Sequence, residues 1–533
     1  MQPIEAKNTL VKTLGDDGNE SFSDPEFSSI DLPGHVTQFV LEETTIEKVH
    51  RAFKQKILNC EQLVTAYLAR IEAYNLKGPE LRAILTVNPH ALEEARALDF
   101  KFATDPDNLG CLHGIPMVLK DNFDTFDMPT SGGSVAMRNS QPRKDAFSVM
   151  KMRQAGAVIL AKSNLQEFSR GGVSISSLGG QSLNPYDLTR NPGGSSGGTA
   201  VALATNMALV GTGSDSGQSI RSPSSANSLV GIRPTRGLIS RTGIIPTCFT
   251  QDEIGPIART VEDAARLLDV MIGYDAADPI TALGIGKTPA TYTSALKTDA
   301  LKGARIGLLV NLLGKEEQHA EVNKAMDFVA MTMQQLGATV ISFYMPELSA
   351  LTERVATDTY EAQAAFDKYA INLPVDAPVK SFRQLVETKS ALPVIQETME
   401  KELSIVNGMH TDEYKTRMLN REKLRIALYS KMAELGIDAI LYPLQSILVT
   451  KTGQPDQPER NGVLSNGTGM PAVTFQAGFS TPTSEAPLGV PIGAEMLGRD
   501  YTEYTLLGYV YAFEQFSNVR RMPLSTPPLG SSD

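Results

Sequence analysis

Two glycine-bracketed serine clusters and one lysine are the residues of this sequence whose types and spacing could do chemistry. The first cluster, residues 193–198, reads Gly-Gly-Ser-Ser-Gly-Gly, and the second, residues 217–221, reads Gly-Gln-Ser-Ile-Arg. Lys120 ends the apolar run at 115–119. A serine hydroxyl becomes an effective nucleophile when a base lies within hydrogen-bond reach. A lysine can be that base when burial lowers its pKa enough to leave the amine neutral.

These residues describe a hydrolase site that needs no histidine. A second serine can relay a proton between the lysine and the nucleophile, and the glycines let backbone N–H groups approach a substrate carbonyl and hold the oxyanion. The apolar run predicts a buried central strand that ends at Lys120, with Asp121 and Asn122 starting a loop. Small and apolar residues at 199–208 predict a buried helix after the first cluster. The serine loops are therefore expected to be ordered segments rather than flexible linkers.

One alternative site uses a histidine. Residues 194–198 match the G-x-S-x-G nucleophile elbow with Ser196 at the centre, and His319 or His410 could complete a triad. The elbow should follow a buried strand, whereas residues 184–192 contain two asparagines and two prolines, which are typical of a loop. An elbow-type serine esterase remains an open alternative.

The chain resembles the amidase signature hydrolases, which use a Ser-cisSer-Lys triad. The resemblance extends over residues 44–523, and the segments that carry it are the two serine clusters and 113–122, 237–241, 252–256, 260–264, 469–473 and 489–493. By position, it implies that Ser219 is the nucleophile, Ser195 the bridging serine and Lys120 the general base. It also implies a cis peptide bond between Gly194 and Ser195.

The resemblance further implies an oxyanion hole made of backbone N–H groups, those of Ser216, Gly217, Gln218 and Ser219. The family usually has two glycines before the nucleophile, and this chain has Gly217-Gln218 instead. The Gln218 side chain is therefore expected to reshape the acyl pocket or to point away from the substrate. The candidates for substrate binding are Met128, Thr130, Gly194 and Gln218. Residues 346–418 match the family least, are predicted to be helical and form either an amphipathic surface cover or a wall of the substrate path.

Composition argues against several classes of function. The 533 residues carry a net charge of −11 with no basic run, so neither nucleic acid nor an anionic membrane is an expected partner. No apolar stretch has the length of a membrane span. The cysteines, Cys60, Cys111 and Cys248, lack metal-ligand spacing. We expect no metal, no cofactor and a small amide as the partner, and leave a homodimer open.

Strands that alternate with helices predict the fold. Helical periodicity covers 45–57 and 60–74, and further helices and buried strands are expected at 147–161, 304–343, 437–443 and 503–516. This alternation indicates a largely parallel or mixed sheet covered on both faces. The resemblance implies a single large α/β/α domain with a mixed central sheet and an N-terminal helical segment. We place it at 36–523, between a polar arm at 1–35, a candidate for disorder, and a tail at 524–533.

The expected function is that of an amidase acting on a small carboxamide or anilide through an acyl-enzyme. The alternatives are an esterase or carbamate hydrolase on the same triad, or an amidotransferase-like subunit. The N-terminus has no basic region followed by an apolar core, which favours the cytoplasm. An exported protein whose signal peptide is absent from this sequence is the alternative.

Overall fold

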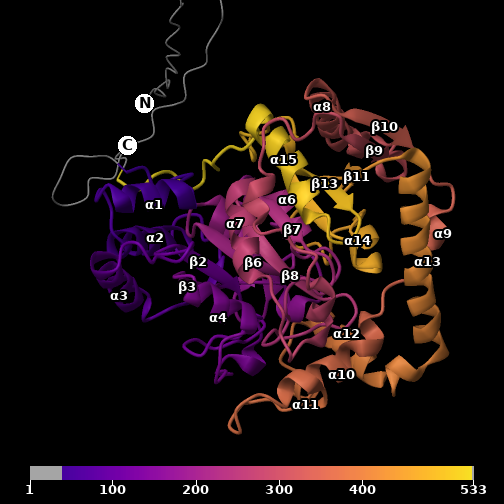
Figure 1. The fold of residues 1–533 in the computed structure, drawn as a ribbon. Helices are drawn as coiled ribbons and strands as arrows, with labels where there is room; N and C mark the ends of the chain where they lie inside the picture. The colour runs from indigo at the N-terminus through magenta and orange to yellow at the C-terminus, as the bar shows by residue number, and fades with distance from the viewer. Residues whose placement is uncertain (1–38, 531–533) are drawn as a thin grey trace, which may run out of the picture.

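A mixed eleven-stranded sheet organises the computed structural model, which describes residues 39–530 (Figure 1). Across the sheet the strands lie in the order β1 (Ile84–Val87), β3 (Val158–Ser163), β2 (Pro116–Lys120), β6 (Val210–Asp215), β8 (Glu253–Ala258), β7 (Val230–Arg233), β12 (Ala472–Phe479), β13 (Pro491–Gly498), β11 (Ala439–Pro443), β9 (Arg305–Leu309) and β10 (Thr339–Phe343). The arm predicted at 1–35 lies outside the described residues.

Parallel and antiparallel pairs alternate in blocks across this sheet. β2 is parallel to both of its neighbours, β3 and β6, and β9 is parallel to β10 and β11. The central strands from β6 to β11 and the edge pair β1–β3 are antiparallel. The prediction of a mixed sheet is therefore confirmed. A separate two-stranded sheet pairs β4 (Ile175–Ser176) with β5 (Gly180–Gln181).

Both faces of the sheet are covered. Every residue of β2, β6, β8, β11 and β13 is buried, which is typical of strands with packed layers on both sides. Helices α7 (Val261–Met271), α8 (Ala320–Gln335) and α15 (Glu503–Ser517) pack on the strands, and α15 contacts both of the others. Helices α5 (Gly197–Ala204) and α6 (Arg221–Ala226) contact each other and the sheet.

The helices at the start of the chain pack beside its C-terminal end (Figure 1). They are α1 (Ile46–Lys54), α2 (Cys60–Tyr74) and α3 (Ala91–Thr104). The bounds predicted for α2 are confirmed, because Asn59 caps the helix and forms a reciprocal capping box with Gln62. The buried Arg70 guanidinium donates to the carbonyl of Thr526 at 2.9 Å. The predicted tail, where it is described, therefore packs on α2.

A helical region forms the lower and right edges of the molecule in Figure 1. It comprises α9 (Leu348–Thr352), α10 (Asp358–Ala370), α11 (Phe382–Glu387), α12 (Pro393–Ser404) and α13 (Asp412–Leu435). Its own hydrophobic cluster joins Phe366 and Phe382 to Phe168 from the first half of the chain. The helical prediction for 346–418 is confirmed, and the contact with Phe168 anchors the region next to the loops that follow β3.

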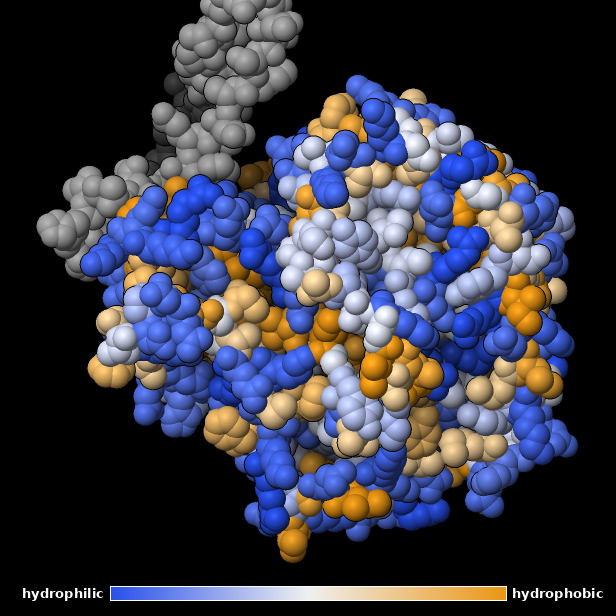
Figure 2. Space-filling view, viewed as in Figure 1, coloured by the Kyte–Doolittle hydropathy of each residue, from blue (hydrophilic) through white to orange (hydrophobic). Residues whose placement is uncertain are grey.

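The surface mixes hydrophilic and hydrophobic residues. An apolar band crosses the middle of the face in Figure 2, between hydrophilic regions. Such mixing is ordinary for a globular protein, because polar groups alone cannot cover the surface. Within residues 39–530, no helix has both the length and the apolar character to cross a membrane.

Candidate active site

Lys120 is the last residue of β2 and is completely buried. Its Nζ lies 2.6 Å from Ser195 Oγ, 2.8 Å from Ser214 Oγ and 3.2 Å from the Ser214 carbonyl oxygen. Burial lowers the pKa of the Lys120 amine to about 7, although the carboxylates of Asp215 and Asp252 act in the opposite direction. A large fraction of the amine is therefore neutral at neutral pH.

The three contacts of Lys120 match the hydrogen-bonding capacity of a neutral amine, which has two N–H donors and one lone pair. The Ser214 carbonyl can only accept, so it takes one N–H. When the Ser214 hydroxyl accepts the second N–H of the amine, the lone pair of the amine is left to accept from the hydroxyl of Ser195. The Ser214 hydroxyl is itself held by Asn122, whose Nδ2 donates to it at 2.9 Å. This arrangement suits a base directed at Ser195.

Ser195 follows a cis peptide bond, Gly194–Ser195, as the resemblance to the amidase signature hydrolases implied. A side chain at Gly194 would place Cβ 2.8 Å from both the Gly172 backbone and Ser174 Oγ, so only glycine fits there. The next residue joins the two serine clusters, because the Ser196 N–H donates to the Ser219 carbonyl at 3.2 Å.

A buried ionic network holds the segment that carries Ser219. Asp215 accepts from the Ile220 N–H at 3.1 Å and from Arg221 Nε at 2.9 Å. Arg221 Nη1 donates to Glu495 Oε1 at 2.7 Å, and the Tyr442 hydroxyl donates to the same oxygen. All of these side chains are buried. Since an uncompensated buried charge is costly, the network fixes the turn between β6 and α6.

The carbonyl groups of this turn are engaged, whereas its N–H groups are not. The Ser216 carbonyl accepts from Gln251 Nε2 at 2.8 Å and from Asn466 Nδ2 at 3.2 Å. The Gly217 carbonyl accepts from Arg221 Nη2. Within the described residues, the backbone N–H groups at 216–219 donate no hydrogen bond to another protein group.

Comparison with known proteins places this arrangement in a family. The family model described as Amidase matches residues 62–507. The chain belongs to the amidase family. A probable amidase of Arabidopsis thaliana is 33% identical over 503 residues, which cover 91% of this chain and 92% of that protein. A glutamyl-tRNA(Gln) amidotransferase subunit of Thermosynechococcus vestitus is 31% identical over 485 residues, which cover 89% of this chain and 98% of the relative.

Solved structures show the same fold. The peptide amidase of Stenotrophomonas maltophilia superposes with a TM-score of 0.82 at 33% identity, covering 90% of this chain and 98% of that one. An amidase family protein of Bacillus anthracis gives a TM-score of 0.81 at 30% identity and covers 91% of this chain and 92% of that one. The family match and these structural similarities show that the chain is a hydrolase of C–N amide bonds.

Gln218 is accommodated in this amidase by a glycine from a distant part of the chain. The side chain is buried, and a Cβ at Gly462 would lie 2.7 Å from Gln218 Cβ. Neither Oε1 nor Nε2 of Gln218 has a hydrogen-bond partner among the described residues. A buried amide with both ends unpaired is unusual, so this position is distinctive within the site.

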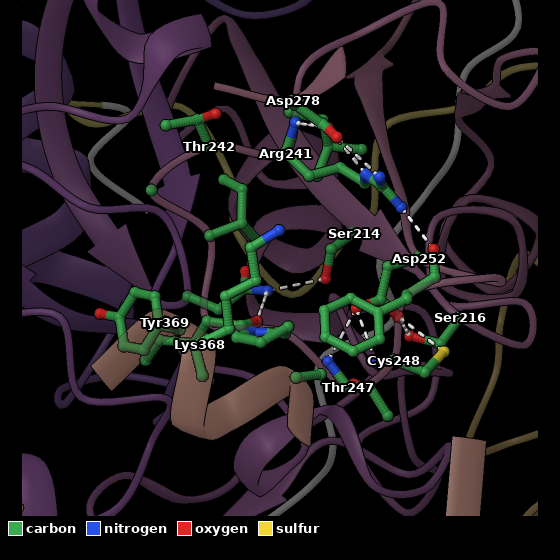
Figure 3. Close-up of a pocket in the computed structure, with 18 of the residues that line it drawn as sticks. Ser214, Ser216, Arg241, Thr242, Thr247, Cys248, Asp252, Asp278, Lys368 and Tyr369 are labelled. Carbon is green, nitrogen blue, oxygen red and sulfur yellow. Dashed lines mark hydrogen bonds and ion pairs between the residues drawn. The ribbon is translucent and has the colours of Figure 1, made fainter. Parts of the chain in front are cut away.

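A cavity of about 170 Å³ lies beside Ser214, which contacts Lys120, although Lys120, Ser195 and Ser219 are not among its lining residues (Figure 3). Asn122, Ser214 and Ser216 lie on its wall, and α10 contributes Ala365 and Tyr369. In Figure 3 the cavity is bounded by Arg241 and Asp278 at the top, Lys368 and Tyr369 at the lower left, and Ser216 at the lower right. Helix α10 is therefore a wall of this cavity, in line with the second of the two interpretations of 346–418.

None of the four predicted substrate-binding residues, Met128, Thr130, Gly194 and Gln218, lines this cavity. Met128 and Thr130 are completely buried, and Thr130 Oγ1 accepts from Lys162 Nζ at 2.9 Å and donates to the Phe123 carbonyl. Gly194 is enclosed by the Gly172 backbone and the Ser174 side chain, as described above. The roles of all four in binding stay predictions.

The histidine-dependent alternative lacks its histidine. Ser196 Oγ lies 3.4 Å from the Ser214 carbonyl. His319 Nε2 pairs with Glu459 Oε2 at 2.6 Å, and the His410 side chain is exposed. In the part of the chain that the structure describes, neither histidine makes a hydrogen bond with Ser196.

Sequence reasoning missed Ser214 as a member of the site. Two of the three contacts of the Lys120 amine are to this residue. The polar residues that end β6 are visible in the sequence, but the parallel pairing of β6 with β2 is seen only in the structure. Parallel neighbours end at the same edge of a sheet, which brings Ser214 to Lys120.

Proposed function

We propose that this amidase hydrolyses a small carboxamide or anilide through an acyl-enzyme on Ser219, with Ser195 and Lys120 completing the triad. The observation that carries this proposal is the 2.6 Å contact between Lys120 Nζ and Ser195 Oγ, made by a buried amine whose pKa is lowered by burial to about 7. The link between Ser196 and the Ser219 carbonyl keeps the two serine clusters adjacent.

Acylation moves one proton in each direction along the triad. Neutral Lys120 takes the proton of the Ser195 hydroxyl while Ser195 takes the proton of Ser219. Ser219 Oγ then bonds to the carbonyl carbon, and the electron pair of the C=O bond moves to oxygen. When the C–N bond breaks, Ser195 returns a proton to the leaving amine, and Lys120 restores the proton of Ser195.

Deacylation repeats the relay with water as the nucleophile. Water attacks the ester carbon and gives a proton through Ser195 to Lys120, the Ser219–acyl bond breaks, and Ser219 regains its proton. In both steps the free N–H groups at 216–219 would hold the oxyanion. Their carbonyl groups are engaged by Gln251, Asn466 and Arg221, which supports this role because the turn is fixed before substrate binds.

Membership of an amidotransferase complex is the second candidate. Several relatives are named as subunits of glutamyl-tRNA(Gln) amidotransferase, which favours this candidate. The alignment with this chain covers up to 99% of the length of such a subunit. The peptide amidase neighbour favours the amidase, with a TM-score of 0.82 against 0.71 for the amidotransferase structure from Thermotoga maritima. An esterase or carbamate hydrolase would use the same triad on a different substrate.

A substrate screen with the purified chain tests these candidates. We expect turnover of primary amides or anilides by the chain alone, and a mass increase of the acyl group on the peptide that contains Ser219. The matched control is Ser219→Ala, which should show neither. Turnover restricted to esters or carbamates would select the alternative reaction, and a chain that hydrolyses amides only in a complex would select the amidotransferase.

A further inference from the structure

We infer that the 170 Å³ cavity beside Ser214 and Ser216 is the acyl subsite of this amidase and that it accepts a neutral group with a single aromatic ring. The inference rests on the proposed function, because it assumes that Ser219 attacks the substrate carbonyl. It adds the class of acyl group to that proposal.

The position of the cavity relative to the triad favours the acyl side. The leaving nitrogen must meet the Ser195 hydroxyl, which returns its proton, yet no residue of 191–196 lines the cavity. Ser216, which begins the turn with the free N–H groups, does line it, and so does Ser214. Ser219 itself is not a lining residue, so the cavity lies next to the start of the oxyanion turn and not at the Ser195 hydroxyl, to which the leaving nitrogen must come.

The size and walls of the cavity suit one aromatic ring. An engineered protein cavity of about 150 Å³ with apolar walls binds benzene, so 170 Å³ leaves room for a ring and little more. The apolar part of the wall includes Ile244, Ile245, Pro246, Phe249, Ile254 and Ala365. The cavity is open on one side, so a fused two-ring group would extend out of it toward solvent, whereas a methyl group leaves most of it unfilled.

The charges inside the cavity, those of Arg241, Asp252 and Asp278, are already engaged, which disfavours a charged ligand there. Arg241 pairs with Asp278 at 2.8 Å. The Asp252 carboxylate accepts from the N–H groups of Thr247 and Cys248 at 2.7 and 2.9 Å and from the Ser216 hydroxyl. Lys368 is exposed at the rim, with Nζ 5.6 Å from the centre of the Phe249 ring. A buried charge on the ligand would have no partner inside, so a neutral group binds best.

Two neighbouring alanines of α10 allow a matched test. Ala365 is buried on the cavity wall, whereas Ala364 is exposed on the same helix. Ala365→Leu adds volume to the cavity, and Ala364→Leu adds the same side chain outside it. The substrates are acetamide, phenylacetamide and 1-naphthylacetamide, and the measured quantity is kcat/KM for each with all three proteins.

We expect the natural chain to prefer phenylacetamide to the other two amides. Ala365→Leu should lower the ratio of phenylacetamide to acetamide at least about tenfold, because filling a fitted apolar pocket changes discrimination by this order. Ala364→Leu should leave the ratio unchanged. A folded Ala365→Leu protein with an unchanged ratio overturns the inference while leaving the amidase proposal intact.

Binding separates the cavity from the chemistry. Phenylacetamide binding to Ser219→Ala is measured by calorimetry, with the Ala365→Leu substitution added to the same background. Weaker binding with the added leucine supports the subsite even if no amide is turned over, in which case only the proposed function fails. Equal binding by the two proteins overturns the subsite. Circular dichroism and melting temperature identify a variant that does not fold. If Ala365→Leu does not fold, Ile245→Ala replaces it. This substitution enlarges the cavity, so the ratio of kcat/KM for 1-naphthylacetamide to that for phenylacetamide should rise.

Discussion

The Lys120 amine lies 2.8 Å from the Ser214 hydroxyl and 3.2 Å from the carbonyl oxygen of the same residue. Ser214 thus contacts the amine at two points, and Asn122 fixes the Ser214 hydroxyl from the other side. Because the amine has one lone pair, two neighbouring acceptors determine the direction in which that pair points. Ser214 is in this sense a positioning residue for the base.

Ser214→Ala should therefore weaken catalysis without abolishing it. The carbonyl contact remains, but one N–H of Lys120 loses its acceptor and the lone pair is no longer aimed at Ser195 alone. We expect kcat to fall more than KM changes, and Ser214→Thr, which keeps the hydroxyl, to recover most of the rate. The control is Ser148→Ala, at a buried serine on α4 (Phe147–Gln154) whose hydroxyl has no partner among the described residues. Equal losses in all three variants would contradict a positioning role.

The triad assignment predicts unequal effects of three alanine variants. Ser219→Ala and Lys120→Ala should abolish turnover, because nucleophile and base act as one unit. Ser195→Ala should keep a weak activity, because water can partly replace the relay. The rates are measured on the best amide of the screen, with circular dichroism to confirm folding. A near-normal rate for Ser219→Ala together with loss in Ser196→Ala would contradict the assignment and favour the nucleophile elbow.

The pH dependence follows from the protonation of Lys120. The amine accepts a proton only when neutral, and burial places its pKa at about 7, so kcat/KM should rise with pH below 7 and level off above it. Asp252 is one of the carboxylates that raise this pKa, so Asp252→Asn should move the midpoint to lower pH. A profile that falls as pH rises through 7, or a midpoint displaced upward in the variant, would show that Lys120 is not the base.

The sequence predicted the elements of this site better than their contacts. An apolar run before a single lysine was sufficient to predict β2 and its buried last residue, because a buried strand has a strong local pattern. Ser214 was missed because its role depends on which strand lies beside β2. The pairing of Val118 with Gly211 places β6 beside β2, and no local pattern of residues 116–120 or 210–215 specifies that pairing.

The support of the nucleophile turn was equally hidden. Arg221 and Glu495 are 274 positions apart in the sequence. They pair because β13, the strand that carries Glu495, lies next to β12 in the sheet. A glutamate inside an otherwise apolar strand can be recognised in the sequence, but its partner cannot. The same holds for Gly462, whose missing side chain makes room for Gln218.

Gln218 is predicted to tune specificity rather than to catalyse. Its side chain packs against Gly462 with both amide atoms unpaired, so the chain does not need these atoms to hold the turn. Gln218→Gly should therefore keep kcat/KM on small amides within about tenfold, a change of about 1.4 kcal/mol in the barrier. The ranking among bulkier acyl groups should change, because the volume beside the nucleophile changes.

A volume-matched variant separates shape from hydrogen bonding. Gln218→Met keeps the length of the side chain and removes the unpaired amide, which costs about 1–3 kcal/mol when buried. We expect Gln218→Met to raise the melting temperature and to keep the natural ranking of acyl groups, since volume sets that ranking. If Gln218→Met changes the ranking as Gln218→Gly does, the amide itself contacts the substrate. If instead Gln218→Gly loses about a thousandfold on every substrate alike, the scale of losing an oxyanion donor, the side chain supports the oxyanion turn and the specificity role is wrong.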